Sequence, residues 1–395
     1  MRPNSVEIHD GVAMPRNISA SCRHGRERGF VLITMAAAAF ALIGILGVAV
    51  DFGRMFIAKN ETQEYCDAAA LAAALALDGT TTGITNAKSA VSTSTNTWNL
   101  DTTTITNPTV TFATTTAGPW AANPNPATGY IYARVSVTVS MPLYFLSAVV
   151  AQTTQNVTSS ATAGQIPITS FPRGLAPYSA VSTNTTGPNF GLVVGDSYDI
   201  QWPQYNATRN GCGVNNPDKC FNQPPCSGDS KAAEAAVVAN WGPNTSGYWG
   251  STSNNTIEQE ILDVIQLQAV DVGTNIQPVL SNGTKASEAG YLDERASQDT
   301  DTTHNTVTDY LAAVHNGRRL IPVPIVDPVD PTHTNVIGYG QFLLLANGPG
   351  NSNYYTKTTN GNDPFCAIYA GPYNVGSTGP GAGGSTGASR VKLVQ

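Results

Sequence analysis

The sequence predicts an α+β protein with a single N-terminal transmembrane helix that continues into a long helix, followed by a β-rich extracytoplasmic region with short helices. Three observations predict this class. An uncharged apolar span runs from Phe30 to Val50, apolar and polar residues alternate from Ile131 to Met141, and short helical and strand-like patterns follow towards the C-terminus. Charged residues make up only 12% of the 395, against roughly a quarter in ordinary soluble domains. This polar but weakly ionic composition suits an exported protein.

Composition divides the chain into four regions. Residues 1–29 are predicted to be a basic cytoplasmic arm, and residues 30–78 the transmembrane and extended helix. Residues 79–165 are predicted to be a Thr/Ser-rich β region, and residues 166–395 an extracytoplasmic α+β region with cysteine-containing loops.

The apolar span has the length of a membrane anchor. As a helix it measures about 31 Å, close to the thickness of a hydrocarbon core. Its large apolar side chains include Phe30, Leu32, Phe40, Leu42, Ile45, Leu46 and Val50. Arginines precede it at Arg16, Arg23, Arg26 and Arg28, which predicts a single-pass membrane protein with a cytoplasmic N-terminus and the chain after about Asp51 on the outer side of the membrane. A cleaved secretory signal is the alternative, but its apolar core is usually about 7–15 residues long.

Helix-forming sequence continues beyond the span to Leu77 and ends at Asp78 and Gly79, a reasonable C-terminal cap. The last part, Ala68–Leu77, is almost entirely Ala and Leu. Small side chains allow another helix or a sheet to approach closely, which includes self-association through this Ala-rich helix. Ala is also the best helix former, and the two explanations are compatible.

A basic arm, the apolar span, a V-D-x-G-R step and a Q-x-x-x-D-A-A-A-L-A-A-A segment follow one another, matched by Val50, Asp51, Gly53, Arg54, Gln63 and Asp67. In this order and spacing, Arg26–Leu77 resembles the N-terminal module of TadG-related (TadE/G-like) proteins of tight-adherence (Tad/Flp) pilus systems. More loosely, Arg318–Pro328 and Val336–Leu345 resemble the C-terminal part of the same proteins. The resemblance implies a non-enzymatic, membrane-anchored, minor pilin-like component that acts in pilus assembly or surface attachment. Its implied partners are the lipid bilayer and other pilus-assembly or pilin-like membrane proteins.

Two features near the span leave alternatives open. Asp51 and Arg54 could form a helical ion pair or contact a partner protein, and simple placement of charges at the membrane edge explains them equally well. Pilins cut by a prepilin peptidase have Gly before the cleaved bond and an aromatic residue after it, as Gly29 and Phe30 do. Those pilins carry Glu at the fifth mature position, where this chain has Thr34, and we expect the anchor to remain uncut.

The middle of the chain reads as β structure. Residues 80–116 are Thr/Ser/Asn-rich and are predicted to be loops and edge strands. The following strand places Ile131, Ala133, Val135, Val137, Val139 and Met141 on its buried face. The short apolar segment that follows is predicted to be a helix or a hairpin connection, and Asn156–Ala163 to return as a neighbouring strand.

Short elements are predicted towards the C-terminus. The predicted helices are Lys231–Asn240, Ile257–Gln268 (with a capping box from Thr256 and Gln259) and Val307–His315. The predicted strands are Leu192–Trp202, Leu320–Val326, Val336–Leu345 and Phe365–Tyr369. Pro322 and Pro324 should confine their strand to a sheet edge.

Four cysteines, Cys212, Cys220, Cys226 and Cys366, lie in an oxidising compartment if this topology holds, and they are candidates for disulfides. Four cysteines allow three pairings, among which sequence cannot choose. A zinc site is the rival, but the spacing lacks a C-x2-C knuckle and no His lies between the first three. Cys66 could pair between subunits or remain a buried thiol.

The chain lacks three motifs that would carry catalysis or metal-dependent adhesion: H-E-x-x-H, a phosphate-binding loop and a D-x-S-x-S adhesion loop. Asp299, Asp301 and Asp309 invite a calcium site, but without the Gly and Glu of an EF-hand loop a solvated loop capping the next helix is the better account. We therefore expect no enzyme, metal or cofactor, and the net charge of −7 argues against nucleic acid. The alternative is an envelope-anchored hydrolase or carbohydrate-binding module, for which Trp202, Trp241, Trp249 and Tyr248 are the first aromatics to inspect.

Overall fold

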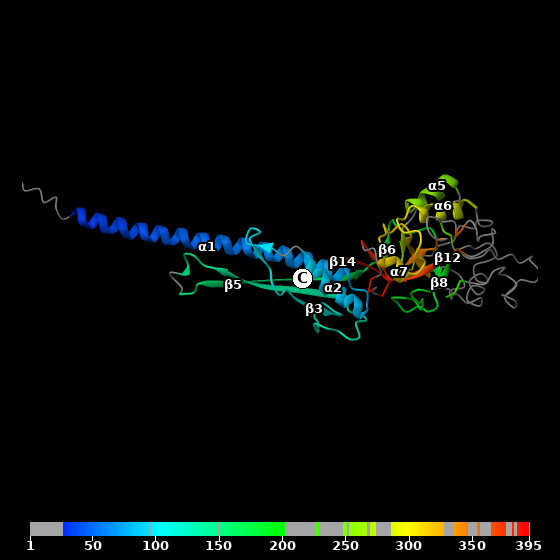
Figure 1. Cartoon of the computed structure of the whole chain (residues 1–395), viewed down its shortest axis with the longest axis horizontal. Coiled ribbons are helices and arrows are strands. Elements are labelled where there is room, and N and C mark those ends of the chain that lie inside the picture. The colour runs from blue at the N-terminus through cyan, green and yellow to red at the C-terminus, as the bar shows by residue number, and fades with distance from the viewer. Residues whose placement is uncertain are drawn as a thin grey trace, which may run out of the picture. The chain divides into compact units, whose positions relative to one another are not determined.

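The structure is a computed structural model (Figure 1). It describes residues 27–94, 97–147, 151–201, 226–228, 248–250, 253–266, 269–273, 286–327, 335–346, 354–355, 365–376, 381–382 and 385–394. The helices in these ranges are α1 (Glu27–Leu75), α2 (Thr81–Thr93), α5 (Asn254–Leu262), α6 (Ala286–Ser297) and α7 (Val307–Ala312). The strands are β1 (Thr97–Trp98), β2 (Thr103–Thr104), β3 (Thr109–Ala113), β4 (Tyr132–Pro142), β5 (Thr154–Pro167), β6 (Ser170–Phe171), β7 (Ala180–Val181), β8 (Ser197–Gln201), β9 (Val270–Asp271), β10 (Leu320–Val326), β11 (Val336–Leu344), β12 (Phe365–Gly371), β13 (Tyr373–Val375) and β14 (Ala388–Val394). A long N-terminal helix before a β-rich region with short helices confirms the predicted α+β class.

Two compact units make up the described chain. The first takes its residues from Met1–Phe56 and Met141–Gln155, so it contains the N-terminal part of α1 and the turn between β4 and β5. The second takes its residues from Ile57–Ser140 and Asn156–Gln395.

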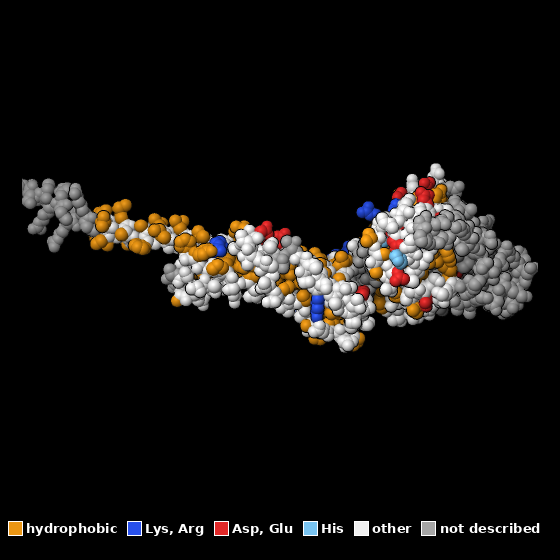
Figure 2. Space-filling model, viewed as in Figure 1, with side chains coloured by type: hydrophobic (Ala, Val, Ile, Leu, Met, Phe, Trp, Pro, Cys, Tyr) orange, Lys and Arg blue, Asp and Glu red, His pale blue; other side chains and the backbone are white. Residues whose placement is uncertain are grey.

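The N-terminal part of α1 is apolar on every side. Every residue from Phe30 to Leu46 is exposed, including Phe40 at 79%. Figure 2 shows this stretch as hydrophobic surface without charged side chains on the visible face. Its one hydroxyl, Thr34 Oγ1, donates to the carbonyl oxygens of Phe30 and Val31 at 3.0 Å. In the described part of the chain, α1 is the helix long and apolar enough to cross a bilayer, which indicates a membrane anchor.

In the second unit, the outer part of α1 packs closely through small residues. The adjoining sheet has the strand order β13-β14-β5-β4-β3, with β13 and β14 parallel. Ala69, Ala70, Ala73 and Ala74 are fully buried. The helix comes near enough for Gln165 Nε2 on β5 to donate to the carbonyl oxygens of Ala74 at 2.8 Å and Leu77 at 2.6 Å. The Ala-rich segment therefore serves a helix–sheet contact within this chain.

The predicted neighbouring strand is confirmed, since β5 lies beside β4 in the sheet, and the two form a hairpin. Alternate residues of β4, from Ala133 to Met141, are buried. Across the hairpin, Thr138 Oγ1 lies 3.0 Å from Thr158 Oγ1, and Arg134 Nε donates to Thr162 Oγ1 at 3.1 Å. The two pairs run in opposite directions along the strands, as in an antiparallel pair.

The prediction of loops and edge strands for residues 80–116 is wrong at its start, where α2 forms. Thr80 caps this helix by accepting the Gly83 N–H at 3.1 Å, and Ile84, Ala87 and Val91 bury one face at helical spacing. Their apolar spacing was hidden among Thr and Ser, residues at home in strands and turns. The end of the region agrees with the prediction, since β3 is an edge strand.

The C-terminal sheet has the order β7-β10-β11-β12-β8 and confirms the three strands predicted after residue 319. The edge placement predicted from Pro322 and Pro324 is wrong, because β10 lies between β7 and β11. β7 pairs only with Ile325 and Val326, at the far end of β10. On the β7 side of β10, the Pro322 carbonyl oxygen accepts the Ala176 N–H at 2.8 Å. The nitrogen of Pro322, which has no hydrogen to donate, faces this same side, where β7 does not extend, so no strand-to-strand hydrogen bond is lost.

The short helices differ from their predicted bounds. The N-cap of α5 is Ser253, without a side-chain capping bond, so the predicted capping box of Thr256 and Gln259 is wrong. α7 is shorter than the predicted helix Val307–His315, and Val314, beyond its end, is 91% exposed. β8 covers only the second half of the predicted Leu192–Trp202 strand. The predicted helix at 231–240 lies outside the described residues.

Candidate functional site

Asp51 ends the apolar span and binds the tip of the β4–β5 hairpin, which we define as Leu143–Ser147. Its carboxylate accepts the backbone N–H groups of Tyr144 at 3.1 Å, Phe145 at 2.8 Å and Leu146 at 2.6 Å. Asp51 itself is fully buried. A buried carboxylate with three N–H donors is well satisfied, and the donors are satisfied with it.

Arg54, one turn further along α1, binds the same tip. Its Nη1 donates to the Pro142 carbonyl oxygen at 3.2 Å, and its guanidinium carbon lies 4.3 Å from the centre of the Tyr144 ring. Each motif charge is thus engaged by the hairpin of its own chain. Sequence reasoning missed this, because it considered an ion pair, a partner protein or a membrane edge for Asp51 and Arg54.

Gly47 completes the contact on the membrane side of Asp51. A Cβ added there would lie 2.5 Å from the Cβ of Phe145, so only glycine lets the tip approach α1. Gly53 differs, since a Cβ there would meet nothing within 4 Å. The described contacts therefore explain the Asp and Arg of the V-D-x-G-R step but not its glycine.

The second half of the motif also binds backbone. Gln63 Nε2 donates to Asp67 Oδ1 at 2.8 Å and to the Ser160 carbonyl oxygen on β5 at 3.0 Å. Glu61 accepts the N–H groups of Asn99 at 2.6 Å and Leu100 at 3.0 Å. Polar residues in the part of α1 that belongs to the second unit thus bind successive segments of that same unit.

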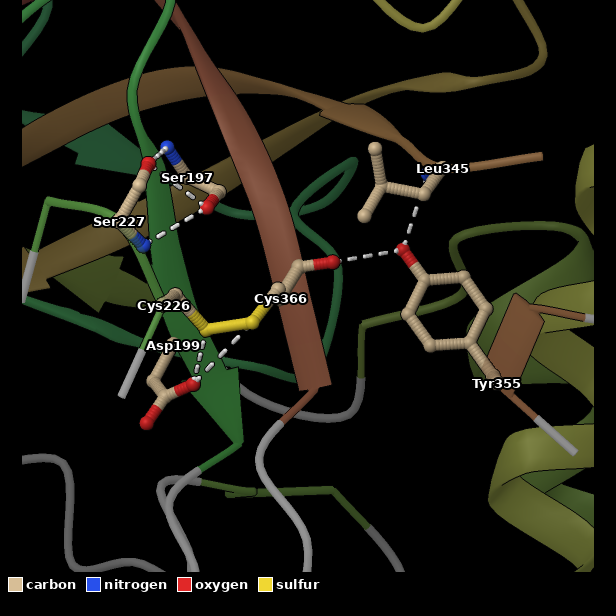
Figure 3. Close-up of a disulfide and its surroundings, with 7 residues drawn as sticks. All are labelled: Ser197, Asp199, Cys226, Ser227, Leu345, Tyr355 and Cys366. Carbon is tan, nitrogen blue, oxygen red and sulfur yellow. Dashed lines mark hydrogen bonds between the residues drawn. A yellow bond between two sulfur atoms is a disulfide. The ribbon is translucent and has the colours of Figure 1, made fainter. Parts of the chain in front are cut away.

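Cys226 and Cys366 form a disulfide, shown in Figure 3. It connects β12 to a residue 140 positions earlier in the chain. Asp199 Oδ1 lies 2.6 Å from the sulfur of Cys226 and 3.9 Å from that of Cys366. Two cysteines and a carboxylate are also metal-ligand types, but disulfide sulfurs offer no thiolate to an ion. Cys212 and Cys220 lie outside the described residues, and Cys66 is a buried free thiol.

The acidic segment considered for calcium uses its oxygens within the protein. Asp299 Oδ2 accepts a hydrogen bond from the Tyr310 hydroxyl at 2.6 Å and another from the backbone N–H of Arg319 at 2.8 Å. Asp309 Oδ2 accepts the Thr306 hydroxyl at 2.7 Å, and Thr306 caps α7, so the predicted capping role is confirmed. Asp299 and Asp301 are buried rather than solvated, which corrects the other half of that prediction.

Arg319 forms the centre of this buried cluster and was not singled out from the sequence. Its guanidinium donates to the carbonyl oxygens of Leu344, Asp301 and His304 and to Asn305 Oδ1, at 2.7–3.1 Å. Burial and the hydrogen bond to Asp299 raise the pKa of Tyr310, so its hydroxyl remains a donor.

Hydrogen bonds also shift the pKa of Asp301. Burial alone would raise it, but bonds from the N–H groups and side chains of Thr303 and His304 outweigh burial and lower the pKa to about 2. These arrangements stabilise loops around the C-terminal sheet.

The aromatic residues proposed for a sugar surface are core residues where the structure describes them. Tyr248 is 1% exposed and Trp249 is 5% exposed, and Trp249 Nε1 donates to the Tyr178 carbonyl oxygen at 2.7 Å. Trp202 and Trp241 lie outside the described residues.

Comparison with known proteins gives one match. A family model described as "Putative Flp pilus-assembly TadE/G-like" matches residues 29–76, the segment that contains the span, Asp51, Arg54 and the Ala-rich helix. No curated protein and no solved structure matches the chain. The match links the chain to Flp/Tad pilus systems and the membrane. The resemblance seen in the sequence is therefore confirmed over residues 29–76, which are similar to the TadE/G-like family of Flp pilus-assembly proteins.

Proposed function

We propose that this protein is a non-enzymatic, single-pass inner-membrane component of a Tad/Flp-type pilus system, minor pilin-like, acting in pilus assembly or surface attachment. The observation that carries the proposal is the Tad module at residues 29–76, whose first part is an exposed apolar helix. Lipid or the apolar helices of other pilin-like proteins are the partners that such a surface accepts.

The arginines before Phe30 support a cytoplasmic N-terminus, which leaves the second unit outside the cytoplasm. A disulfide between Cys226 and Cys366 suits that compartment. The anchor remains uncut in this proposal, because Thr34 stands where processed pilins carry Glu. Self-association is assigned to the exposed apolar N-terminal part of α1. The Ala-rich segment is less suited to it, because its buried side already packs against other residues of this chain.

The test is mass spectrometry of the mature N-terminus in two fractions of the native host, washed membranes and sheared surface appendages. Chains that retain residues before Gly29 and stay in membranes are expected. A peptide beginning at Phe30 in the sheared fraction would instead show a processed filament subunit. Deleting the gene should reduce the yield of sheared pili, and unchanged pilus yield and surface attachment would contradict a role in this system.

A further inference from the structure

We propose that the tip of the β4–β5 hairpin is a second membrane-contacting element, which lies in the headgroup region of the bilayer beside the end of the transmembrane span. This inference goes beyond the proposed function but rests on its membrane anchor. The occupant of the tip surface is lipid.

The depth of the tip follows from its bonds to Asp51. The uncharged span from Phe30 to Val50 measures about 31 Å and fills the hydrocarbon core, so Asp51 lies at the boundary. Three hydrogen bonds of 2.6–3.1 Å hold Tyr144, Phe145 and Leu146 on that carboxylate. These residues belong to the same compact unit as the span. Wherever Asp51 lies in the membrane, the tip lies at nearly the same depth.

The chemistry of the tip fits that depth. The sequence from Leu143 to Ala151 contains no charged residue. Tyr144 is 62% exposed and Phe145 is 46% exposed, although both are large aromatic side chains. In bulk water, this exposed apolar surface would contribute no stabilisation from burial. At membrane–water interfaces, by contrast, aromatic residues are enriched.

The charged groups around the tip also fit a position at the membrane–water interface. The three N–H donors surround the Asp51 carboxylate, which reduces the cost of holding an anion next to the hydrocarbon. Arg54 stacks over Tyr144 and is partly exposed, the position from which a guanidinium can reach lipid phosphate. On another side of α1 and at the same level, Phe52 at 47% and Phe56 at 69% continue the exposed aromatic surface.

The experiment uses tryptophan fluorescence of the full chain in vesicles of phosphatidylethanolamine and phosphatidylglycerol. Part of the lipid carries bromine, either near the headgroup end of the acyl chain or near its middle. Three variants each add one tryptophan: Tyr144→Trp at the tip, Phe40→Trp in the span, and Val314→Trp, which is 91% exposed in the second unit. The native tryptophans give a background common to all of them.

We expect shallow bromine to remove most of the emission added by Tyr144→Trp and deep bromine most of that added by Phe40→Trp. Val314→Trp should behave as wild type with added unquenched emission. If Phe40→Trp is quenched and Tyr144→Trp is not, the tip proposal is overturned while the anchor stands. If neither variant is quenched, the proposal that α1 spans the membrane is contradicted as well. A blue-shifted but unquenched Tyr144→Trp would mean that protein, such as a second copy, covers the tip, and this also overturns lipid contact.

Discussion

The carboxylate of Asp51 accepts the backbone N–H of Leu146 at 2.6 Å, across 95 positions of sequence. The residue that ends the apolar span thereby holds the turn of a hairpin that lies far along the sequence. Since Asp51 and Arg54 belong to the recognised motif, the motif describes a tertiary contact within one chain. The contact joins the matched segment, residues 29–76, to a hairpin tip that lies outside that segment.

Asp51→Ala should release the tip. Its three N–H groups lose their acceptor, so amide hydrogen exchange at Tyr144, Phe145 and Leu146 should accelerate by roughly tenfold or more. Asp51→Asn keeps one oxygen acceptor and should give an intermediate rate. The measurement is hydrogen–deuterium exchange of the full chain in detergent micelles. Glu64→Ala, a change of an exposed acid on the same helix, is the control and should leave these amides unchanged. Equal protection in Asp51→Ala and wild type would refute the hydrogen bonds as the source of order.

Gly47→Ala should push the tip away from α1. The new methyl group would lie 2.5 Å from Phe145 Cβ, and relieving such an overlap typically costs about 1–3 kcal/mol. The matched control is Gly44→Ala, one turn earlier, where an added Cβ meets nothing within 4 Å. Exchange at Phe145 should rise in the first variant and stay unchanged in the second. If both glycines tolerate alanine equally, the close approach of α1 and the tip is wrong.

The sequence allowed much of the fold to be predicted where one local pattern decides the structure. The strand from Ala133 to Met141 alternates openly, while the apolar span and the strand at Leu320–Val326 are continuous apolar runs. α2 was missed because three buried apolar residues, Ile84, Ala87 and Val91, are a weak signal among Thr and Ser. The central position of β10 was missed because a two-residue neighbour leaves proline tolerable on that side, which only the tertiary structure shows.

The candidate site was predicted only in part, for a physical reason. The motif at Asp51 and Arg54 was visible, but their partners are backbone groups, which have no sequence signature. Arg319 shows the same limit, since three of its four acceptors are backbone carbonyl oxygens. The pairing of Cys226 with Cys366 could not be chosen either, because it depends on the register of β12 with β8.

Arg319→Met should lower the free energy of unfolding by about 3 kcal/mol or more, because it leaves several buried oxygen acceptors without a donor. Arg318→Met is the matched control. That neighbouring guanidinium binds the Leu262 carbonyl oxygen and Gln298 Oε1 at a partly exposed position, and its loss should cost about 1 kcal/mol or less. Urea unfolding of the full chain in micelles, followed by tryptophan fluorescence, measures both. Similar losses in the two variants would remove the special role of the buried Arg319.

Loss of the disulfide should destabilise the second unit by about 2–5 kcal/mol, because the bond closes a long loop of the unfolded chain. The measurement is urea unfolding of wild type with and without a reductant, beside the double variant Cys226→Ser and Cys366→Ser. The double variant should unfold at lower urea even without reductant. Any further effect of reductant on it reports other pairs, Cys212 and Cys220 above all. A double variant as stable as wild type would contradict the prediction.

Acid should destabilise the loop around Asp301 within a defined pH range. The folded protein holds the pKa of Asp301 at about 2, below the ordinary value near 3.8, because hydrogen bonds from Thr303 and His304 favour the carboxylate. The resulting stabilisation is complete above about pH 4 and is lost as the pH falls towards 2, since the unfolded chain takes up its proton first. Asp301→Asn removes this titration, so its urea midpoint should fall less steeply between pH 4 and 2 than that of wild type. Asp196→Asn, a change of the same kind outside the cluster, is the control variant. Parallel curves for wild type and Asp301→Asn would mean that the ionised form of Asp301 adds nothing to the fold.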